Sequence, residues 1–464
     1  MAGIGFTLEK ILSKNSYLNL MEAYAYSAIV SSGPVLFTIF SIGILSVLSM
    51  AHMDIRDIMT FRTLVVYIYG VSLILSSPAQ MVITRYLADR MFVKDYAAVV
   101  PAFIGTIIIS IIIHAGLGYA AIRLLDFEFG MTITSVVLFV DVGIIWIAMI
   151  VLSAAKEFTW IVKSFAFGTI LSVVAGFYLG DHFGLLGIAT GFTLGQSLIV
   201  IMLVTQIFTE FEHRNRVEFY FLKYFKRYTA LAFISFFYNI GIWGDKFVFW
   251  FSDKTYEEIR GFLHASSVYD TPVFLAYLFI VPALAIFTIK VETSFYVHYK
   301  KYFLSILNKH PLFVIEERHK NIISDLKLSM GKFLAFQGSI TVIGLVLAPA
   351  IFSFIGMTST NLGVFQIVIL ATFLQAILQI LLILTLYFDF RRDALILSIV
   401  FAVSNIVLTR LSIVLGFSWY GFGYFGACLI SVILALVLFN YRVKNVIFYT
   451  FVDQKIITHA DTVE

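Results

Sequence analysis

The feature that most constrains this chain is its succession of long apolar segments joined by short polar connections. A helix rises ~1.5 Å per residue, so about 20 apolar residues cross the ~30 Å hydrocarbon core of a bilayer. Hydrophobic residues make up 60% of the chain and charged residues 13%, which excludes an ordinary soluble domain. We predict an all-α membrane protein with twelve transmembrane helices, near residues 23–50, 61–84, 98–122, 131–154, 159–180, 185–208, 229–251, 271–290, 333–356, 362–388, 393–415 and 421–441.

The basic residues of the connections predict the orientation, because cytoplasmic loops of membrane proteins are enriched in lysine and arginine. If the N terminus is inside, the outer connections carry only Arg56, Arg123, Lys254 and Arg260. The inner connections and the tail carry many more, among them Arg85, Arg90, Lys94, Arg214, Arg216, Lys223, Lys300, Lys301, Arg391, Arg392 and Arg442. Both termini are therefore predicted to be cytoplasmic.

Two long inner connections divide the chain. The first leaves six helices on either side, which predicts two similar lobes: an N-lobe over 21–210 and a C-lobe over 229–441, joined by a linker over 211–228. Residues 1–20 are predicted to form either an amphipathic helix on the membrane or a solvated leader, and 442–464 a cytoplasmic tail. The second connection, 291–332, has helical apolar spacing over 314–327. Such a surface helix either docks a cytoplasmic partner or rests on lipid headgroups.

The seventh apolar segment contains a polar group of residues near its outer end. Asn239, Trp243 and Lys246 are spaced to share one helix face, whereas Asp245 points about 100° away from Lys246, so the two are not expected to be a side-by-side pair. A charge inside a membrane span costs ~2.5–3.5 kcal/mol on insertion scales. The group therefore either lines a polar route for a hydrophilic substrate or forms a structural ion pair with another helix.

Other polar residues lie inside apolar segments. Asp141 lies about ten residues into its span, close to the bilayer midplane, which favours a role in transport over a buried structural partner. Gln375 and Gln379 share a helix face and either contact sugar hydroxyls or join helices. Arg410 lies in the outer part of the eleventh segment and is a further candidate for the substrate pathway.

Small residues and prolines indicate packing and bending. Gly187, Gly191 and Gly195 recur every four residues, which predicts that another helix approaches this face closely. Pro34, which follows Gly33, and Pro78 lie inside the first two segments, where each removes a backbone donor and is expected to kink its helix.

The sequence gives no sign of catalytic chemistry. The one cysteine, Cys428, permits no intramolecular disulfide, and the nine histidines show no metal-ligand spacing. Gly-rich phosphate loops and nucleophile motifs are absent from the sequence, and the outer connections are too short for an enzymatic domain. We expect no metal, no cofactor and no nucleic-acid partner.

Three sequence motifs resemble one family. They are Met-Ala-Gly-Ile-Gly-Phe-Thr-Leu-Glu-Lys-Ile-Leu at residues 1–12, Ser-Gly-Pro at 32–34, and Ile-Gly-Ile-Trp-Gly-Asp-Lys at 240–246. They resemble PelG, the integral membrane component of the bacterial Pel exopolysaccharide system. The resemblance implies a multi-pass inner-membrane protein near the polysaccharide transporters of the multidrug/oligosaccharidyl-lipid/polysaccharide (MOP) exporter superfamily, with two six-helix lobes around a central cavity.

The same resemblance implies a function. A nascent polysaccharide rich in N-acetylgalactosamine would cross the membrane in a complex with PelD, PelE and the glycosyltransferase PelF. Independently of the resemblance, a polysaccharide path suits the aromatic residues Trp146, Trp243 and Trp250, because the CH faces of sugars stack on rings. For Trp250 we favour anchoring at the membrane interface. The alternatives are a flippase for a lipid-linked oligosaccharide, an ion-coupled small-molecule antiporter with Asp141 or Asp245 as its cation site, a membrane enzyme, and a scaffold for the synthase.

Overall fold

The computed structural model describes residues 17–155, 157–212, 214, 216–283, 295–355 and 359–452. The predicted leader motif at 1–12 and most of the tail lie outside these residues. Eight helices of the described part are long and apolar enough to cross a membrane, and two shorter apolar helices accompany them. The chain is thus a multi-pass, helical membrane protein, whereas the count of twelve spans and the cytoplasmic location of both termini stay predictions.

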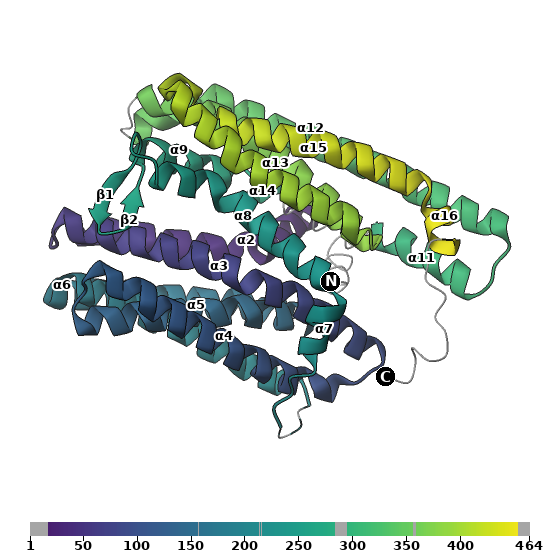
Figure 1. Ribbon diagram of the computed structural model, residues 1–464, viewed down its shortest axis with the longest axis horizontal. Helices are drawn as coiled ribbons and strands as arrows, with labels where there is room; N and C mark the ends of the chain where they lie inside the picture. The colour runs from purple at the N-terminus through teal and green to yellow at the C-terminus, as the bar shows by residue number, and fades with distance from the viewer. Residues whose placement is uncertain are drawn as a thin grey trace.

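Helices from the first part of the chain pack on one another (Figure 1). We call them the first set: α2 (Tyr17–Ser49), α3 (Ile55–Phe92), α4 (Val99–Ile122), α5 (Phe129–Ala155) and α6 (Phe158–Glu210), with the short 3-10 turns η1 (Tyr96–Ala98) and η2 (Arg123–Leu125). Pro34 lies inside α2 and Pro78 inside α3, and both helices continue through their prolines.

Helix α6 holds two of the predicted spans, because the chain reverses at Gly184. This residue has φ 57° and ψ −135°, a conformation that glycine adopts readily because it has no Cβ. The two halves of α6 then lie so close that a Cβ on Gly187 would be 1.9 Å from the carbonyl oxygen of Leu179. A Cβ on Gly191 would likewise be 2.2 Å from the amide nitrogen of Gly176, and one on Gly195 would be 2.0 Å from Oγ of Ser172. The glycine stripe therefore packs one half of α6 against the other.

The remaining helices form the second set. It consists of α8 (Thr229–Trp250), α9 (Ser267–Leu278), α11 (Tyr296–Leu307), α12 (Leu312–Ile355), α13 (Ser359–Tyr387), α14 (Arg391–Leu415), the turn η4 (Phe417–Trp419), α15 (Phe422–Lys444) and α16 (Val446–Phe451). The two sets meet where α3 lies along α8 (Figure 1). There the ring of Trp243 packs on Gly70, so close that a Cβ at this position would lie 3.0 Å from the ring and would push it aside.

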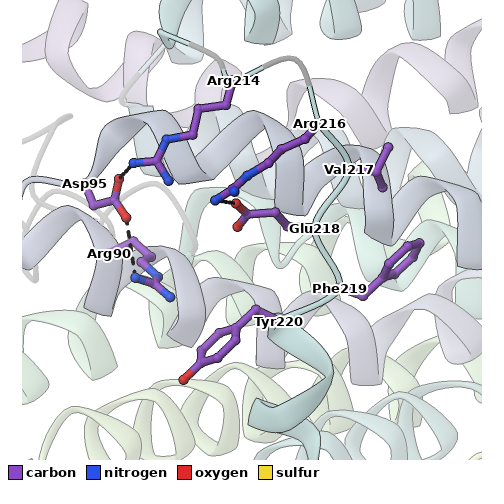
Figure 2. Close-up of a pocket in the computed structure, with 8 residues that line it drawn as sticks. All are labelled: Arg90, Asp95, Arg214, Arg216, Val217, Glu218, Phe219 and Tyr220. Atoms are coloured by element: carbon purple, nitrogen blue, oxygen red, sulfur yellow. Dashed lines mark hydrogen bonds and ion pairs between the residues drawn. The ribbon is translucent and has the colours of Figure 1, made fainter. Parts of the chain in front are cut away.

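The linker between the sets contains a short helix, α7 (Phe221–Arg227). Just before it, the amide of Glu218 donates to the carbonyl oxygen of Pro101 at 3.2 Å, and the backbone presses on Gly105 of α4. Figure 2 shows this segment passing over the end of α3. The linker is thus fixed to the first set before α7 leads into α8.

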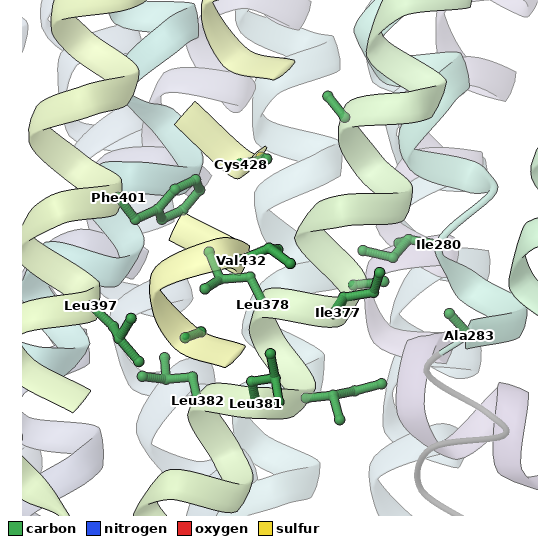
Figure 3. Close-up of a cluster of buried hydrophobic side chains, with 14 of the residues drawn as sticks. Ile280, Ala283, Ile377, Leu378, Leu381, Leu382, Leu397, Phe401, Cys428 and Val432 are labelled. Atoms are coloured by element: carbon green, nitrogen blue, oxygen red, sulfur yellow. The ribbon is translucent and has the colours of Figure 1, made fainter. Parts of the chain in front are cut away.

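The second set has its own apolar core, formed where α13, α14 and α15 meet (Figure 3). Leu378, Leu397, Phe401 and Val432 fill it, and Cys428 is buried among them as a free thiol. In water, burial of each side chain of this size stabilises a fold by ~1.5–3 kcal/mol through the hydrophobic effect. Between helices in a membrane, the stabilisation comes from van der Waals packing instead. This core holds α14 in place beside α8.

Helix α12 corrects one prediction. Residues 314–327 are helical as expected, but they are the first turns of a continuous 44-residue helix that also contains the ninth span. They therefore do not form a separate helix lying on the membrane surface. With α11 they make a helical hairpin that extends past the end of the bundle (Figure 1), fastened by a 2.7 Å hydrogen bond between His319 and the carbonyl oxygen of Val443.

The connection after α8 contains a two-stranded hairpin that the sequence analysis did not predict. Strands β1 (Glu257–Arg260) and β2 (Leu263–Ala265) pair antiparallel, with Gly261 in the turn at φ 54°. Arg260 donates to the carbonyl oxygens of Leu125 and Asp126 in the first set. The hydroxyl of Tyr67, also in the first set, donates to the carbonyl oxygen of His264. The hairpin thus joins the two sets at the end opposite to α7 and α16 (Figure 1).

Candidate functional site

Asp245 is the centre of a polar cluster buried in the second set, with 0% of its surface exposed. The hydroxyl of Tyr269 on α9 donates to Oδ2 at 2.7 Å, and Asn405 on α14 donates to Oδ1 at 3.3 Å. Lys246 Nζ lies 3.2 Å from both carboxylate oxygens. Three neighbours therefore stabilise this carboxylate, one of them a counter-charge. In this conformation the carboxylate is closed off from solvent.

The pairing of Asp245 with Lys246 contradicts our sequence prediction. The two Cα–Cβ bonds do diverge, but the long lysine stem turns back along α8, and its ammonium also donates to the carbonyl oxygen of Ile242 at 3.0 Å. The ammonium lies over the rings of Tyr277 at 4.7 Å, Tyr424 at 5.7 Å and Trp243 at 5.9 Å. Aromatic faces attract a cation, so the rings stabilise the charge that Asp245 balances.

Close packing of α8 on α14 places Asn405 at this cluster. Gly241 lies under the ring of Phe401, and Gly244 lies against Ile406 and Asn405, so the two helices approach closely. Asn405 then reaches the carbonyl oxygen of Gly241 at 2.7 Å, and the hydroxyl of Thr409 donates to its Oδ1 at 3.0 Å. The glycines of the 240–246 motif thus serve helix contact, and they bring a polar residue of α14 to Asp245.

The other predicted residues of this half lie at different places. Gln375 belongs to the cluster, because Tyr424 donates to its side-chain oxygen and in turn shares a 2.8 Å hydrogen bond with Tyr277. Gln379 is half-buried one turn further along α13. Asn239 donates to the carbonyl oxygen of Ser235 in its own helix. Arg410 is exposed and donates to the hydroxyl of Ser252 at 2.8 Å, at the end of α8.

Trp250 does not anchor the protein at the membrane interface, which corrects our expectation. Its ring is buried and stacks on Tyr67 of the first set at 4.5 Å, and its indole nitrogen donates to the carboxylate of Asp270 at 2.9 Å. Trp250 therefore joins the two sets of helices beside the β hairpin.

Asp141 lies in the first set, on α5, with 8% of its surface exposed. The hydroxyl of Ser197 on α6 donates to its Oδ2 at 2.6 Å. Within the described residues, the carboxylate forms no ion pair with a lysine, arginine or histidine. A buried carboxylate without a counter-charge is costly, so this side chain is suited to binding a cation or a proton.

Further polar side chains lie on the helices next to Asp141. Tyr69 on α3 donates to Gln196 at 2.8 Å, and Trp146 on α5 donates to Ser72 at 3.1 Å. His114 on α4 is buried between the hydroxyls of Ser76 and Ser110. The sequence analysis did not single out Ser197, Gln196 or His114, because hydroxyl and amide side chains inside apolar spans are common as helix contacts.

One known protein family matches this chain, from residue 1 to residue 451. Over that range the sequence matches the family described as "PelG: Putative exopolysaccharide Exporter (EPS-E)". The chain belongs to the PelG family. No curated protein matches it. The family match covers both sets of helices, the linker, both polar clusters and the α11–α12 hairpin.

Solved structures show which fold this PelG-family chain has. It is similar to a multidrug resistance MATE-family transporter of the MOP superfamily in its outward-facing conformation, with a TM-score of 0.64 at 11% identity over 91% of this chain and 96% of that one. The inward-facing conformation gives 0.62 at 11% identity, over 91% and 99%. A MOP superfamily transporter from Pyrococcus furiosus gives 0.62 at 11% identity, over 91% and 96%. At this identity the likeness shows a MOP transporter fold and leaves the substrate open.

Proposed function

We propose that this chain moves a nascent, N-acetylgalactosamine-rich Pel-type polysaccharide across the bacterial inner membrane as it leaves a cytoplasmic glycosyltransferase. The family match over residues 1–451 carries this proposal, and the transporter fold supports it. Asp141 and its polar neighbours on α3, α5 and α6 supply groups that are able to hydrogen-bond a carbohydrate. Transport is the class of function that both the family and the fold support, so we expect bond-forming chemistry in a partner.

The coupling to partners is a second part of the proposal, and the α11–α12 hairpin is its place. Helix α12 is about 66 Å long at ~1.5 Å per residue, more than twice the ~30 Å hydrocarbon thickness. Its first turns therefore project well beyond the membrane. The tip nevertheless exposes Leu307, Leu312 and Phe313, next to Lys309. Exposed apolar side chains away from lipid favour a protein contact, and we assign it to PelD-, PelE- or PelF-like proteins.

The experiment that tests transport is reconstitution of the chain with the synthase components in vesicles, with a radiolabelled UDP-sugar supplied outside. If the proposal is right, labelled polymer accumulates in the lumen, protected from added glycosidase. Vesicles that contain the synthase without this chain should make polymer that remains fully digestible. Protected label that extracts into organic solvent as a lipid-linked oligosaccharide would replace threading of the polymer by lipid-linked flipping.

The partner contact has a separate test. We expect Leu307→Ser/Phe313→Ser to abolish co-purification of the synthase proteins, since the variant removes the two most exposed apolar side chains of the tip and leaves the packed face of the hairpin intact. Val346→Ser/Phe354→Ser is the matched control, because these side chains are equally exposed but lie in the membrane-spanning part of α12. Co-purification that survives the tip variant would remove the hairpin from the proposal.

A second candidate is ion-coupled antiport of a small molecule, and it is favoured because Asp141 pairs with no cationic side chain among the described residues. It predicts that the chain alone, in vesicles with an imposed proton or sodium gradient, expels a small organic cation. Transport that needs the synthase components and ignores the gradient would reject this candidate.

A further inference from the structure

A pocket of about 510 Å³ lies at the end of the first set where α3 ends and the linker begins (Figure 2). Three arginines line it from two places in the chain: Arg90 from the last turn of α3, and Arg214 and Arg216 from the linker. Two carboxylates, those of Asp95 and Glu218, and the ring of Tyr220 complete it. The volume is that of a small-ligand site, and the site is independent of the polar clusters described above.

The pocket has three arginines and two carboxylates, and one carboxylate is shared between two of the arginines. Asp95 accepts from Arg214 at 3.1 Å through one oxygen and from Arg90 at 3.4 Å through the other, so one carboxylate serves two guanidinium groups. Arg216 pairs with Glu218. Nε of Arg90 is buried, and within the described residues it has no hydrogen-bond partner. One guanidinium group is thus in excess.

The arginines differ in freedom, which suits them to capture a ligand. Arg90 lies between the rings of Tyr86 and Tyr220, at 5.3 and 5.2 Å, and these contacts fix its guanidinium group. Arg214 and Arg216 keep 47% and 59% of their side-chain surface exposed, so both are able to reorient. At Glu218 the linker backbone is nevertheless held, because the amide of this residue donates to the carbonyl oxygen of Pro101. Two adjustable arginines therefore face one fixed arginine across a formed pocket.

We propose that this pocket binds a phosphate-bearing ligand, with Arg90 as its fixed contact and Arg214 and Arg216 closing on it in place of their carboxylate partners. A guanidinium group matches the oxygens of a phosphate in two parallel hydrogen bonds, as it does a carboxylate, and a phosphate carries the greater charge. The pocket lies at the end of α3, a helix that is long and apolar enough to cross a membrane. The phosphate therefore comes either from a membrane lipid or from a soluble phosphate compound.

The test uses the full chain, purified and delipidated in detergent, in two arms. In the soluble arm pyrophosphate is titrated by calorimetry; in the lipid arm the retention of phosphatidylglycerol is measured by native mass spectrometry. The arm in which the wild type binds saturably identifies the source. In that arm we expect Arg214→Ala/Arg216→Ala to weaken binding by about tenfold or more, because two charge-assisted contacts are lost. Arg214→Lys/Arg216→Lys should weaken it less, because the charge remains without the paired geometry.

Asp95→Asn separates this proposal from a purely structural ion-pair network. If a ligand competes with Asp95 for the arginines, removal of that charge should strengthen binding by several-fold. The control Lys226→Ala/Arg392→Ala removes two exposed cations outside the pocket at the same end and should leave the affinity within about twofold. Absence of saturable binding in both arms, arginine variants that behave as the control does, or weaker binding by Asp95→Asn would each overturn the proposal.

Discussion

The two buried aspartates of this chain, Asp245 and Asp141, have opposite surroundings. Asp245 has no exposed surface and is contacted by Lys246, Tyr269 and Asn405, from three directions. Asp141 has a little exposed surface and one hydroxyl partner, Ser197. The carboxylate of Asp245 is thus neutralised and accepts hydrogen bonds from three side chains. Among the residues that the structure describes, that of Asp141 has one hydrogen-bond donor and no counter-charge.

This difference teaches that depth in the membrane does not by itself mark a transport residue. A buried ion pair with good hydrogen bonds is stable as a unit, and removal of one member leaves the other charge uncompensated. A carboxylate with a single neutral partner is held weakly, so a substrate, a cation or a proton is able to compete for it. We therefore assign Asp245 mainly to structure and Asp141 mainly to transport, and the following substitutions test that division.

The largest expected effect on stability comes from Lys246→Met. Removal of the ammonium leaves the Asp245 carboxylate buried without a counter-charge, which we expect to lower the free energy of unfolding by ~3–5 kcal/mol. Thermal unfolding of the detergent-purified chain, followed by tryptophan fluorescence, measures it. Lys163→Met is the matched control, since Lys163 is exposed and should cost under ~0.5 kcal/mol. The double variant Asp245→Asn/Lys246→Met should recover part of the loss; equal losses would contradict the pairing.

Asn405→Ala should have an intermediate effect. It removes the hydrogen bonds to Gly241 and Asp245 and leaves the Thr409 hydroxyl without its acceptor. Each such bond contributes ~1–3 kcal/mol when charged or buried partners are left unsatisfied, so we expect a loss of about 2 kcal/mol. The same unfolding measurement applies, with Ser404→Ala on the neighbouring, less buried position as control. An unchanged transition would show that α14 does not need this contact.

Asp141→Asn should change stability least and transport most. The amide keeps the volume and a hydrogen bond to Ser197 but carries no charge, so the free energy of unfolding should stay within ~1 kcal/mol of the wild type. Polymer secretion, measured by lectin binding to culture supernatant, should be lost. Asp126→Asn is the matched control, since this exposed residue has φ 49°, a conformation that asparagine also tolerates. Normal secretion by Asp141→Asn would end the transport assignment.

The helices could be predicted from sequence because their apolar length is a local property. Helices occupy the parts of the predicted spans that the structure describes, but the partners of the charged residues could not be predicted. Tyr269 and Asn405 reach Asp245 from α9 and α14, and Ser197 reaches Asp141 from α6, so each contact depends on tertiary packing. The Asp245–Lys246 pair was missed because helix geometry fixes the direction of Cβ and leaves the path of a long lysine stem open.

The continuity of α12 and the β hairpin were missed for a different reason. The first turns of α12 are rich in charge, so a change of composition near residue 332 looked like the start of a new helix, although nothing in helix formation requires uniform polarity. The β hairpin at 257–265 is too short for an alternating pattern, and its contacts with Leu125 and Tyr67 stabilise it. In both cases the local sequence pattern was not enough to predict the element.

The continuity of α12 has a mechanical consequence. A single unbroken helix behaves as a stiff rod, so a tilt of its membrane-spanning half must swing the projecting half in the opposite sense. With about 20 residues projecting over ~30 Å, a tilt of ~10° displaces the far end by about 5 Å. A protein bound at Leu307 and Phe313 would therefore move with each such tilt of the bundle. Conversely, a force that this protein exerts on the far end would favour one tilt of the bundle over the other.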